Sequence, residues 1–196
     1  TEEEEDLLLE AEDFLERGRV EEAESLYDEA MAFYDKAMAL FEQLENAKGI
    51  VETLIEQAKV EKNRGDYNTS ILCLQRALEG CQTEDLFLLQ AEALSGLGGS
   101  YKQLGEYDTS IVHHSRALDI NRQIGHKAQE GINLGSMALV YYRQGAYEKA
   151  LDHHSQALDI AREIGNKREE GTNLGNMATV YQAQGACKKA LEYNTK

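Results

Sequence analysis

Two histidine pairs are the residues of this sequence best suited to metal or proton chemistry. His113-His114 and His153-His154 lie 40 residues apart. Adjacent residues on a helix point about 100° apart, so neither pair forms a good chelate by itself. Stacked repeats could bring His114 towards His154 as a zinc half-site or a pH switch. Because zinc normally takes three or four protein ligands, we instead expect packing histidines and predict no metal site.

Motifs that support catalysis are missing from the sequence. It contains no phosphate-binding GxxxxGK, no HExxH and no GxSxG nucleophile elbow. Carboxylates are abundant, but most fall where they would support i,i+4 pairs on exposed helix faces, as in Glu163–Lys167. We therefore predict no catalytic residue and no cofactor.

The chain is strongly acidic. Its 196 residues include 36 acidic and 20 basic side chains, for a net charge of −16. Such a surface repels phosphate backbones, so we expect no nucleic-acid partner. Residues 1–50 alone carry 17 acidic and four basic side chains, which favours a basic partner, although a solvated acidic cap would give the same pattern. No apolar run approaches the ~18 residues of a membrane span, so we predict no membrane partner.

Three cysteines, Cys73, Cys81 and Cys187, form an odd set without CxxC spacing. Cys73 and Cys81 would lie about 12 Å apart along one helix, too far for a disulfide. The pattern indicates free thiols in a reducing compartment, and we predict a cytoplasmic protein. Thr1 leads directly into the acidic run 2–6 without a signal sequence, so we expect an internal piece of a longer chain.

An internal repeat organises the sequence. Glycines recur every 40 residues, at Gly65, Gly105, Gly145 and Gly185, and Gly18 precedes the first of these by 47. Whole segments recur with them: GINLGSMALVYYRQGAYEKAL at 131–151 returns as GTNLGNMATVYQAQGACKKAL at 171–191. A fixed period of this length is the sequence signature of stacked repeats.

The apolar pattern of one period predicts two helices. Apolar or small residues at 134, 137, 138 and 141 follow the i, i+3, i+4, i+7 spacing of one buried helical face. Gly145 then ends the helix, because glycine adopts the left-handed conformation without a steric cost. A second stripe begins at Ala150 and stops at Gly165. Short turns make neighbouring helices antiparallel, and no pair buries its apolar face alone, so the pairs must stack in an all-α solenoid.

The spacing of these residues resembles the signature of the tetratricopeptide repeat (TPR). The matching residues are Leu134, Ala138, Tyr141, Gly145, Tyr147, Ala150 and Ala157. The resemblance implies a right-handed superhelix of antiparallel helix pairs, as a single array over 1–196. The repeats would be approximately 4–50, 51–90, 91–130, 131–170 and an incomplete 171–196. The period exceeds the family's common length of about 34. Gln82, Arg122 and Arg162 stand where the family usually has proline, and this longer form resembles the repeats of kinesin light chain and the LGN/Pins scaffolds.

A near-duplication offers an explanation for the 47-residue interval. YDEAMAF at 27–33 is followed at once by YDKAMAL at 34–40. Seven residues are nearly two helical turns, so such an insertion would lengthen a helix while rotating its apolar face by only about 20°. We therefore expect one long helix over residues 20–45, which would be either a contact surface or a plain helix extension.

The predicted concave wall of the array is the candidate binding site. The first helix of each pair would line this groove, with residues one step from the buried stripe facing it. These residues combine hydrogen-bonding groups, glycine gaps and an aromatic ring, which suits an extended peptide or an amphipathic helix. The candidates are Lys59, Lys62, Asn63, Ser95, Gly99, Lys102, Gln103, Gly135, Ser136, Leu139, Tyr142, Arg143, Gly175, Asn176, Thr179 and Gln182, with Glu52, Ile55, Glu56 and Glu92 beside them. The TPR resemblance implies that Asn176 bonds the backbone of a ligand.

We predict a non-catalytic scaffold for protein–protein interaction, with self-association through exposed ends of the array as a second property. One alternative is RNA binding by a TPR-like superhelix, which needs a basic channel. The cations that the groove offers are Lys59, Lys62, Lys102 and Arg143. Another alternative is a sensor or regulatory arm of a larger signalling protein.

Overall fold

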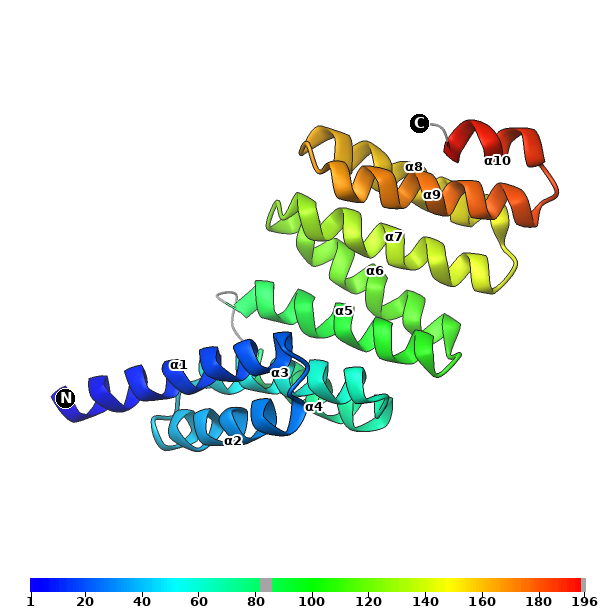
Figure 1. Cartoon of the computed structure of the whole chain (residues 1–196). Coiled ribbons are helices and arrows are strands. Elements are labelled where there is room, and N and C mark those ends of the chain that lie inside the picture. The colour runs from blue at the N-terminus through cyan, green and yellow to red at the C-terminus, as the bar shows by residue number, and fades with distance from the viewer. Residues whose placement is uncertain (82–85, 195–196) are drawn as a thin grey trace. The chain divides into compact units, whose positions relative to one another are not determined.

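The computed structural model describes residues 1–81 and 86–194, and most of them lie in α-helices. Within these ranges no residue lies in a β-strand, which confirms the all-α prediction. The helices of the described ranges are α1 (Glu2–Ala23), α2 (Tyr27–Gln43), α3 (Ala47–Arg64), α4 (Tyr67–Gly80), α5 (Phe87–Gln103), α6 (Tyr107–Gln123), α7 (Lys127–Arg143), α8 (Tyr147–Glu163), α9 (Lys167–Ala183) and α10 (Cys187–Asn194) (Figure 1). None of these helices combines the length and the apolar character needed to cross a membrane.

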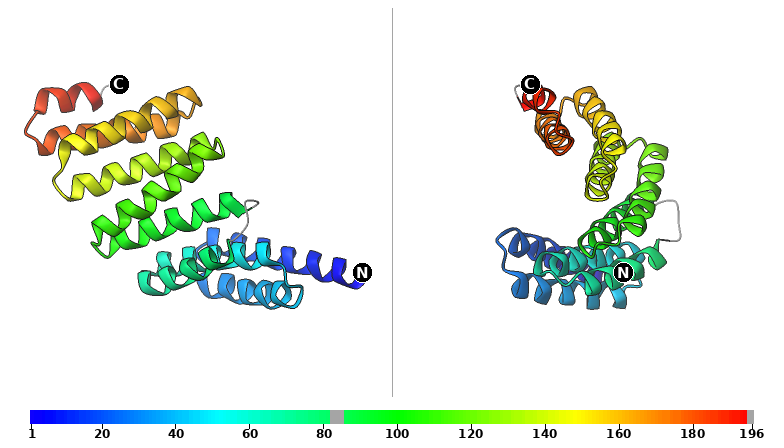
Figure 2. Two further views of the ribbon diagram at one scale, coloured as in Figure 1. Left: turned by 180° about the vertical axis from the view of Figure 1, so that it is seen from behind. Right: turned by 90° about the vertical axis from the view of Figure 1, so that its right-hand side faces the viewer.

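The chain forms two compact units, Thr1–Leu104 and Gly105–Lys196. In the first unit, consecutive helices from α1 to α5 pack together, and α3 also contacts α1 and α5. In the second unit, consecutive helices from α6 to α10 pack together, and α7 also contacts α9. Consecutive helices within a unit run in opposite directions (Figure 2). The first helix of one pair therefore meets the first helix of the next pair inside each unit.

A residue with a left-handed backbone follows the first helix of each pair. After α7, Gly145 has a φ of 74°, and the amide of Ala146 donates to the carbonyl of Tyr141 over 2.9 Å. This arrangement satisfies carbonyls that the end of a helix leaves open. Positive φ angles at Gly65, Gly105 and Gly185 repeat it. The predicted helix ends at these glycines are therefore confirmed.

The prediction of one long helix over residues 20–45 is wrong. Helix α1 ends at Ala23 and α2 begins at Tyr27, with a turn between them. In that turn Ser25 has a φ of 63°. Ser25 lies 40 residues before Gly65, so it takes the place of the turn glycine. The period is thus 40 in the first repeat as well, and no seven-residue insertion exists.

The packing of Tyr34 explains this register. Gly18, which precedes Gly65 by 47 residues in the sequence, lies inside α1 and is covered by the ring of Tyr34. A Cβ at position 18 would lie 2.3 Å from Cε1 of Tyr34, so only glycine fits there. The duplicated segments allow either Tyr27 or Tyr34 to align with Tyr67. Because Tyr34 is fully buried over Gly18, Tyr27 takes the position at the start of α2.

Two clusters of buried apolar side chains hold the helices of the first unit together. Tyr34 and Phe41 of α2 are buried in a cluster that includes residues of α1 and α3. Leu54, Leu74 and Leu97 connect α3, α4 and α5 in a second cluster. Each fully buried side chain of this size contributes about 1.5–3 kcal/mol. Helix α3 is therefore held from both sides.

Similar clusters hold α7 and α9 in the second unit. Leu134 of α7 packs with Leu118 of α6 and with Ala157 of α8. Leu158 of α8 packs with Leu174 of α9. These contacts fix the buried stripe of each first helix, and they leave the adjacent residues of α7 and α9 towards the surface.

Candidate functional site

The first helices of the first unit carry rows of polar residues that repeat every 40 positions. Because α3 packs against both α1 and α5, neighbouring members of a row come from neighbouring helices. The rows are Glu12, Glu52 and Glu92; Arg19, Lys59 and Gly99; and Glu22, Lys62 and Lys102. The first of these rows is wholly acidic, whereas the other two hold four of the cations of this unit and one carboxylate, Glu22.

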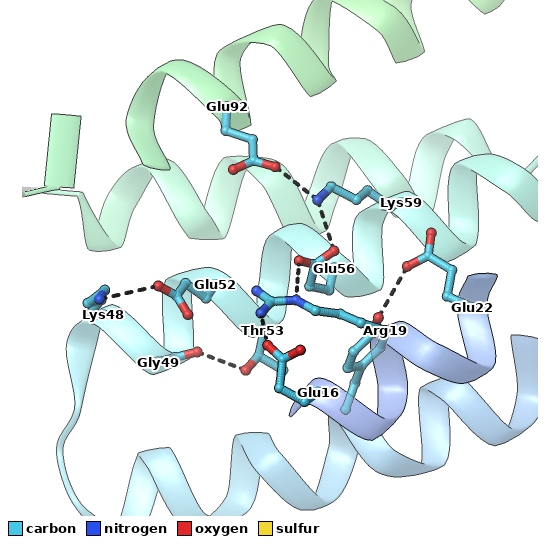
Figure 3. Close-up of polar contacts among 11 residues, drawn as sticks. Glu16, Arg19, Glu22, Lys48, Gly49, Glu52, Thr53, Glu56, Lys59 and Glu92 are labelled. Carbon is cyan, nitrogen blue, oxygen red and sulfur yellow. Dashed lines mark hydrogen bonds and ion pairs between the residues drawn. The ribbon is translucent and has the colours of Figure 1, made fainter. Parts of the chain in front are cut away.

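An alternating chain of charges crosses the three helices (Figure 3). Arg19 of α1 donates from Nε to Oε1 of Glu56 on α3 over 2.8 Å, and from Nη1 to Glu16 within α1. The other oxygen of Glu56, Oε2, lies 2.9 Å from Nζ of Lys59. Lys59 also lies 2.9 Å from Oε1 of Glu92 on α5. Each of these side chains has an oppositely charged neighbour, and this network of charges joins α1, α3 and α5.

Glu56 is the centre of this network of charges and is only 7% exposed. Burial by itself would lower the pKa of Lys59, but the charges of Glu56 and Glu92 outweigh it and raise that pKa. The pKa of Arg19 is raised in the same way, because Glu56 outweighs the effect of burial. Both cations therefore stay charged, and they depend on one nearly buried anion.

Glu22 forms a second polar link between α1 and its neighbours. Its Oε2 accepts a hydrogen bond from Oη of Tyr34 over 3.1 Å, and its Oε1 accepts one from Nδ2 of Asn63 over 3.2 Å. Burial raises the pKa of Glu22, and the hydrogen bond from Tyr34 only partly offsets this. Burial and the nearby carboxylates also raise the pKa of Tyr34, so its hydroxyl remains a donor.

A pocket with a volume of about 180 Å³ opens between α3, α4 and α5. Its buried apolar lining consists of Ile55, Ala58 and Leu74, and Gly96 adds a surface without a side chain. Leu74 extends under α5 because position 96 is glycine: a Cβ there would lie 2.9 Å from Cδ1 of Leu74. The volume is similar to that of apolar cavities of ~150 Å³ that hold a benzene-sized guest.

The rim of this pocket brings three predicted binding residues together. Lys59, Lys62 and Ser95 line it, and Glu92 completes its polar edge. Ile55, which the sequence placed beside these candidates, also lines the pocket, whereas the four remaining candidates of this unit do not. Asn63 bonds Glu22 instead. Gly99, Lys102 and Gln103 lie further along α5.

Arg19 and Glu22 belong to the same polar face, but they are not among the residues predicted from the sequence. The alignment of Gly18 with the turn glycines had shifted the first repeat by seven residues. With Ser25 as the turn residue, Arg19 matches Lys59 and Glu22 matches Lys62 at intervals of 40. The alternative alignment of the duplicated tyrosines with Tyr67 could have indicated this register. Ser25 itself did not indicate it, because serine seldom adopts a positive φ.

The predicted residues of the second unit lie on α7 and α9, which contact each other. Arg143 is the one charged residue among them. They are Gly135, Ser136, Leu139, Tyr142 and Arg143 on α7, and Gly175, Asn176, Thr179 and Gln182 on α9. The hydroxyl of Thr179 donates to the carbonyl of Gly175 over 3.0 Å, and the ring of Tyr142 lies 5.9 Å from that of Tyr147. Asn176 is half-buried.

The second histidine of each pair is a packing residue, as predicted. His154 is fully buried, and its Nδ1 lies 2.9 Å from Oδ1 of Asn173. His114 and Asn133 repeat this contact at 3.1 Å. Because Nδ2 of Asn173 donates to the carbonyl of Glu169, its Oδ1 is the acceptor and Nδ1 of His154 carries the proton. Among the residues that the structure describes, no three His, Cys, Asp or Glu side chains gather as a metal site.

Antiparallel helix pairs with a 40-residue period and a left-handed residue after each first helix define a helical-hairpin repeat protein. The family model described as tetratricopeptide repeat matches residues 89–163 and 130–196, which together span more than half of the chain. The chain therefore belongs to the tetratricopeptide repeat family. Repeats of this family are generally non-catalytic interaction scaffolds.

Solved structures share the fold at low sequence identity. The apo form of RapI has a TM-score of 0.80 and 18% identity, over 94% of this chain and 52% of that chain. Aspartyl phosphate phosphatase F from Bacillus subtilis has a TM-score of 0.85 and 19% identity, over 95% and 49%. A STAND protein with a tetratricopeptide repeat sensor from Pyrococcus horikoshii has a TM-score of 0.82 and 18% identity, over 95% and 30%. The chain spans about half the length of the first two. At these identities the likeness concerns the fold alone, and no curated protein matches the sequence.

Proposed function

We propose that each unit of the chain offers an exposed face of its first helices to a partner segment, and that the chain has no catalytic role. The pocket between α3, α4 and α5 carries this proposal. It combines an apolar lining with Lys59, Lys62 and Glu92 at its rim. Such a mixture, apolar with a few placed polar groups, is typical of sites that bind a specific ligand.

The face of α7 and α9 supports an extended ligand in particular. Gly175 is exposed, and a Cβ there would meet no atom within 4 Å. Asn176 beside it forms no side-chain hydrogen bond with the residues in the described ranges. An amide with a free donor and acceptor suits the backbone of a peptide. We propose that this face contacts the backbone of a bound peptide.

RNA binding receives less support from the charges. RNA affinity depends on cations that are free to neutralise phosphates. Lys59 is instead held between Glu56 and Glu92, and Lys62 acts on the nearby carboxylate of Glu22. A protein partner is therefore favoured.

A role as a sensor arm is compatible with the same binding face. The STAND protein from Pyrococcus horikoshii is described as carrying a tetratricopeptide repeat sensor, and this chain covers 30% of it. We propose the sensor role as the second candidate function. In this role, ligand binding to the repeats would be coupled to a further domain, and the binding surface would be the same as in a scaffold.

Self-association through the end helices is a further part of the proposal. Leu9 of α1 is 64% exposed and Leu191 of α10 is 66% exposed. Burying such side chains between copies would be favourable. Sedimentation velocity over a range of concentrations tests this, with Leu9→Glu and Leu191→Glu as variants. A wild-type chain that stays monomeric throughout would overturn the self-association.

Binding of short peptides tests the proposed site. Peptides are selected from a displayed library on the wild-type chain, and their affinities are measured by fluorescence anisotropy. We expect Asn176→Ala to weaken binding several-fold, and Lys62→Ala to change the affinity of peptides that contact the pocket rim. The matched controls are Lys188→Ala on α10 and Asn68→Ala on α4, both exposed on second helices. Peptides that bind the site variants and the controls with wild-type affinity would place the binding surface elsewhere.

A further inference from the structure

The first-unit pocket has room for one side chain of a ligand. Its volume of about 180 Å³ is bounded by Ile55, Ala58 and Leu74, each at most 3% exposed. A space of this size and lining favours an apolar group such as an aromatic ring. A polar group placed against these three side chains would lose its hydration without gaining a partner.

The charges at the rim are unequal in what they offer a ligand. Lys59 is already placed 2.9 Å from both Glu56 and Glu92, so its charge is compensated. Glu92 uses Oε1 for Lys59, and its side chain is 38% exposed. No partner of its Oε2 lies in the described ranges. This oxygen can therefore accept a hydrogen bond from a cationic group on the ligand.

The net charge of the whole first unit also favours a cationic ligand. Residues 1–104 hold 25 acidic and nine basic side chains, whereas residues 105–196 hold 11 of each. The whole net charge of −16 therefore belongs to the unit that contains the pocket. Such a field raises the local concentration of cationic ligands and speeds their association.

We propose that this pocket recognises a basic peptide segment, in which one apolar side chain enters the pocket and an adjoining Lys or Arg pairs with Oε2 of Glu92. The apolar group supplies the affinity and the cation supplies the selectivity. This inference rests on the proposed function and names the chemistry of its partner.

Three short synthetic peptides test the recognition directly. The first has a central Phe flanked by Lys, the second has Ala in place of Phe, and the third has Glu in place of Lys. We expect the Lys–Phe peptide to bind about tenfold or more tightly than the Lys–Ala peptide, because the ring leaves water. The Glu–Phe peptide should bind more weakly still.

Variants of the protein distinguish the pocket from the general acidic field. Glu92→Gln should reduce the preference for Lys over Glu flanks several-fold, whereas Glu42→Gln, an exposed carboxylate of α2, should leave it unchanged. Circular dichroism shows whether each variant is folded. Equal binding of the Phe and Ala peptides would mean attraction by charge alone and would overturn the inference. Equal binding of the Lys and Glu peptides would also overturn it.

The proposed function has a separate readout. If library peptides bind with dependence on Asn176 while the Lys–Phe peptide does not bind, the scaffold role stands and this pocket assignment fails. If neither kind of peptide binds, both fail.

Discussion

Nε of Arg19 lies 2.8 Å from Oε1 of Glu56, and this hydrogen bond joins α1 to α3 at a nearly buried site. The same carboxylate contacts Lys59 through its other oxygen, Oε2, at 2.9 Å. Because both oxygens are used, Glu56 fixes the positions of the two cations that border the polar face. The network therefore has a structural role in addition to any contact with a ligand.

Replacing Glu56 by Gln should destabilise the first unit, because Arg19 and Lys59 would lose their shared anion. We expect the free energy of unfolding to fall by about 1–2 kcal/mol. This is less than the ~3–5 kcal/mol of a fully buried pair, since the Arg19 side chain is 36% exposed. Urea denaturation followed by circular dichroism measures the change.

Glu16→Gln is the matched control for this variant. Glu16 also pairs with Arg19, but its side chain is 67% exposed. Its replacement should change the free energy of unfolding by less than about 0.5 kcal/mol. Equal effects of the two substitutions would show that the burial of Glu56 is not what gives the network its strength.

Glycines inside the helices should divide into two classes when they are replaced by alanine. A Cβ at Gly99 would meet no atom within 4 Å, so Gly99→Ala should raise the free energy of unfolding by about 0.5–1 kcal/mol. A Cβ at Gly49 would lie 2.3 Å from Cδ1 of Phe41, so Gly49→Ala should lower it by about 1–3 kcal/mol. Thermal and urea unfolding measure both.

The Gly99→Ala variant also tests the predicted binding face. Gly99 lies on α5 among the predicted binding residues, and no contact within the described ranges requires glycine there. We expect Gly99→Ala to weaken peptide binding while it stabilises the fold. A Gly99→Ala chain that is more stable and binds peptide as well as the wild type would exclude a close ligand approach at this residue.

Replacement of Ser25 by Gly should stabilise the first repeat. Ser25 has a φ of 63°, a left-handed conformation that costs an L-residue about 1–2 kcal/mol and costs glycine little. We expect a gain of about 1 kcal/mol in the free energy of unfolding, measured in urea. Ser155→Gly inside α8 is the control and should lower stability by about 0.5–1 kcal/mol. A loss of stability at both positions would contradict the turn assigned at Ser25.

The residues of the first repeat show how far sequence reasoning extends in this protein. The positions of Gly65, Gly105 and Gly145 were sufficient to predict helix ends, because glycine is the residue that favours a positive φ. Ser25 carries the same backbone without the same residue, so the register of α1 was lost. The buried contact of Tyr34 with Gly18 decides that register, and it is a tertiary contact that no local pattern shows.

The candidate site was predictable only in part for the same reason. Lys59, Lys62 and Ser95 follow from the repeat, and the structure places them around one pocket. Arg19 depends on the corrected register. The depth of the pocket depends on Leu74 passing under Gly96, which is a matter of side-chain packing and leaves no periodic signal.

Acid should destabilise the second unit through His154. Burial lowers the pKa of this histidine below its ordinary value of 6.5, and the hydrogen bond to Asn173 only partly offsets this. Below about pH 6.5 the unfolded chain takes up a proton that the folded chain does not, so the free energy of unfolding falls as the pH falls towards the folded-state pKa. One such group contributes a slope of at most about 1.4 kcal/mol per pH unit.

His154→Leu isolates this contribution. Urea denaturation between about pH 7.5 and about pH 5 measures the free energy of unfolding. On acidification this free energy should fall less in His154→Leu than in the wild type. The variant also loses the bond to Asn173, but that loss does not depend on the protonation of position 154. Leu158→Ala on the same helix is the control, because it removes buried apolar contacts without a titrating group and should lower stability equally at each pH. If the wild type and His154→Leu lose stability in parallel as the pH falls, His154 is not the residue that couples protonation to unfolding.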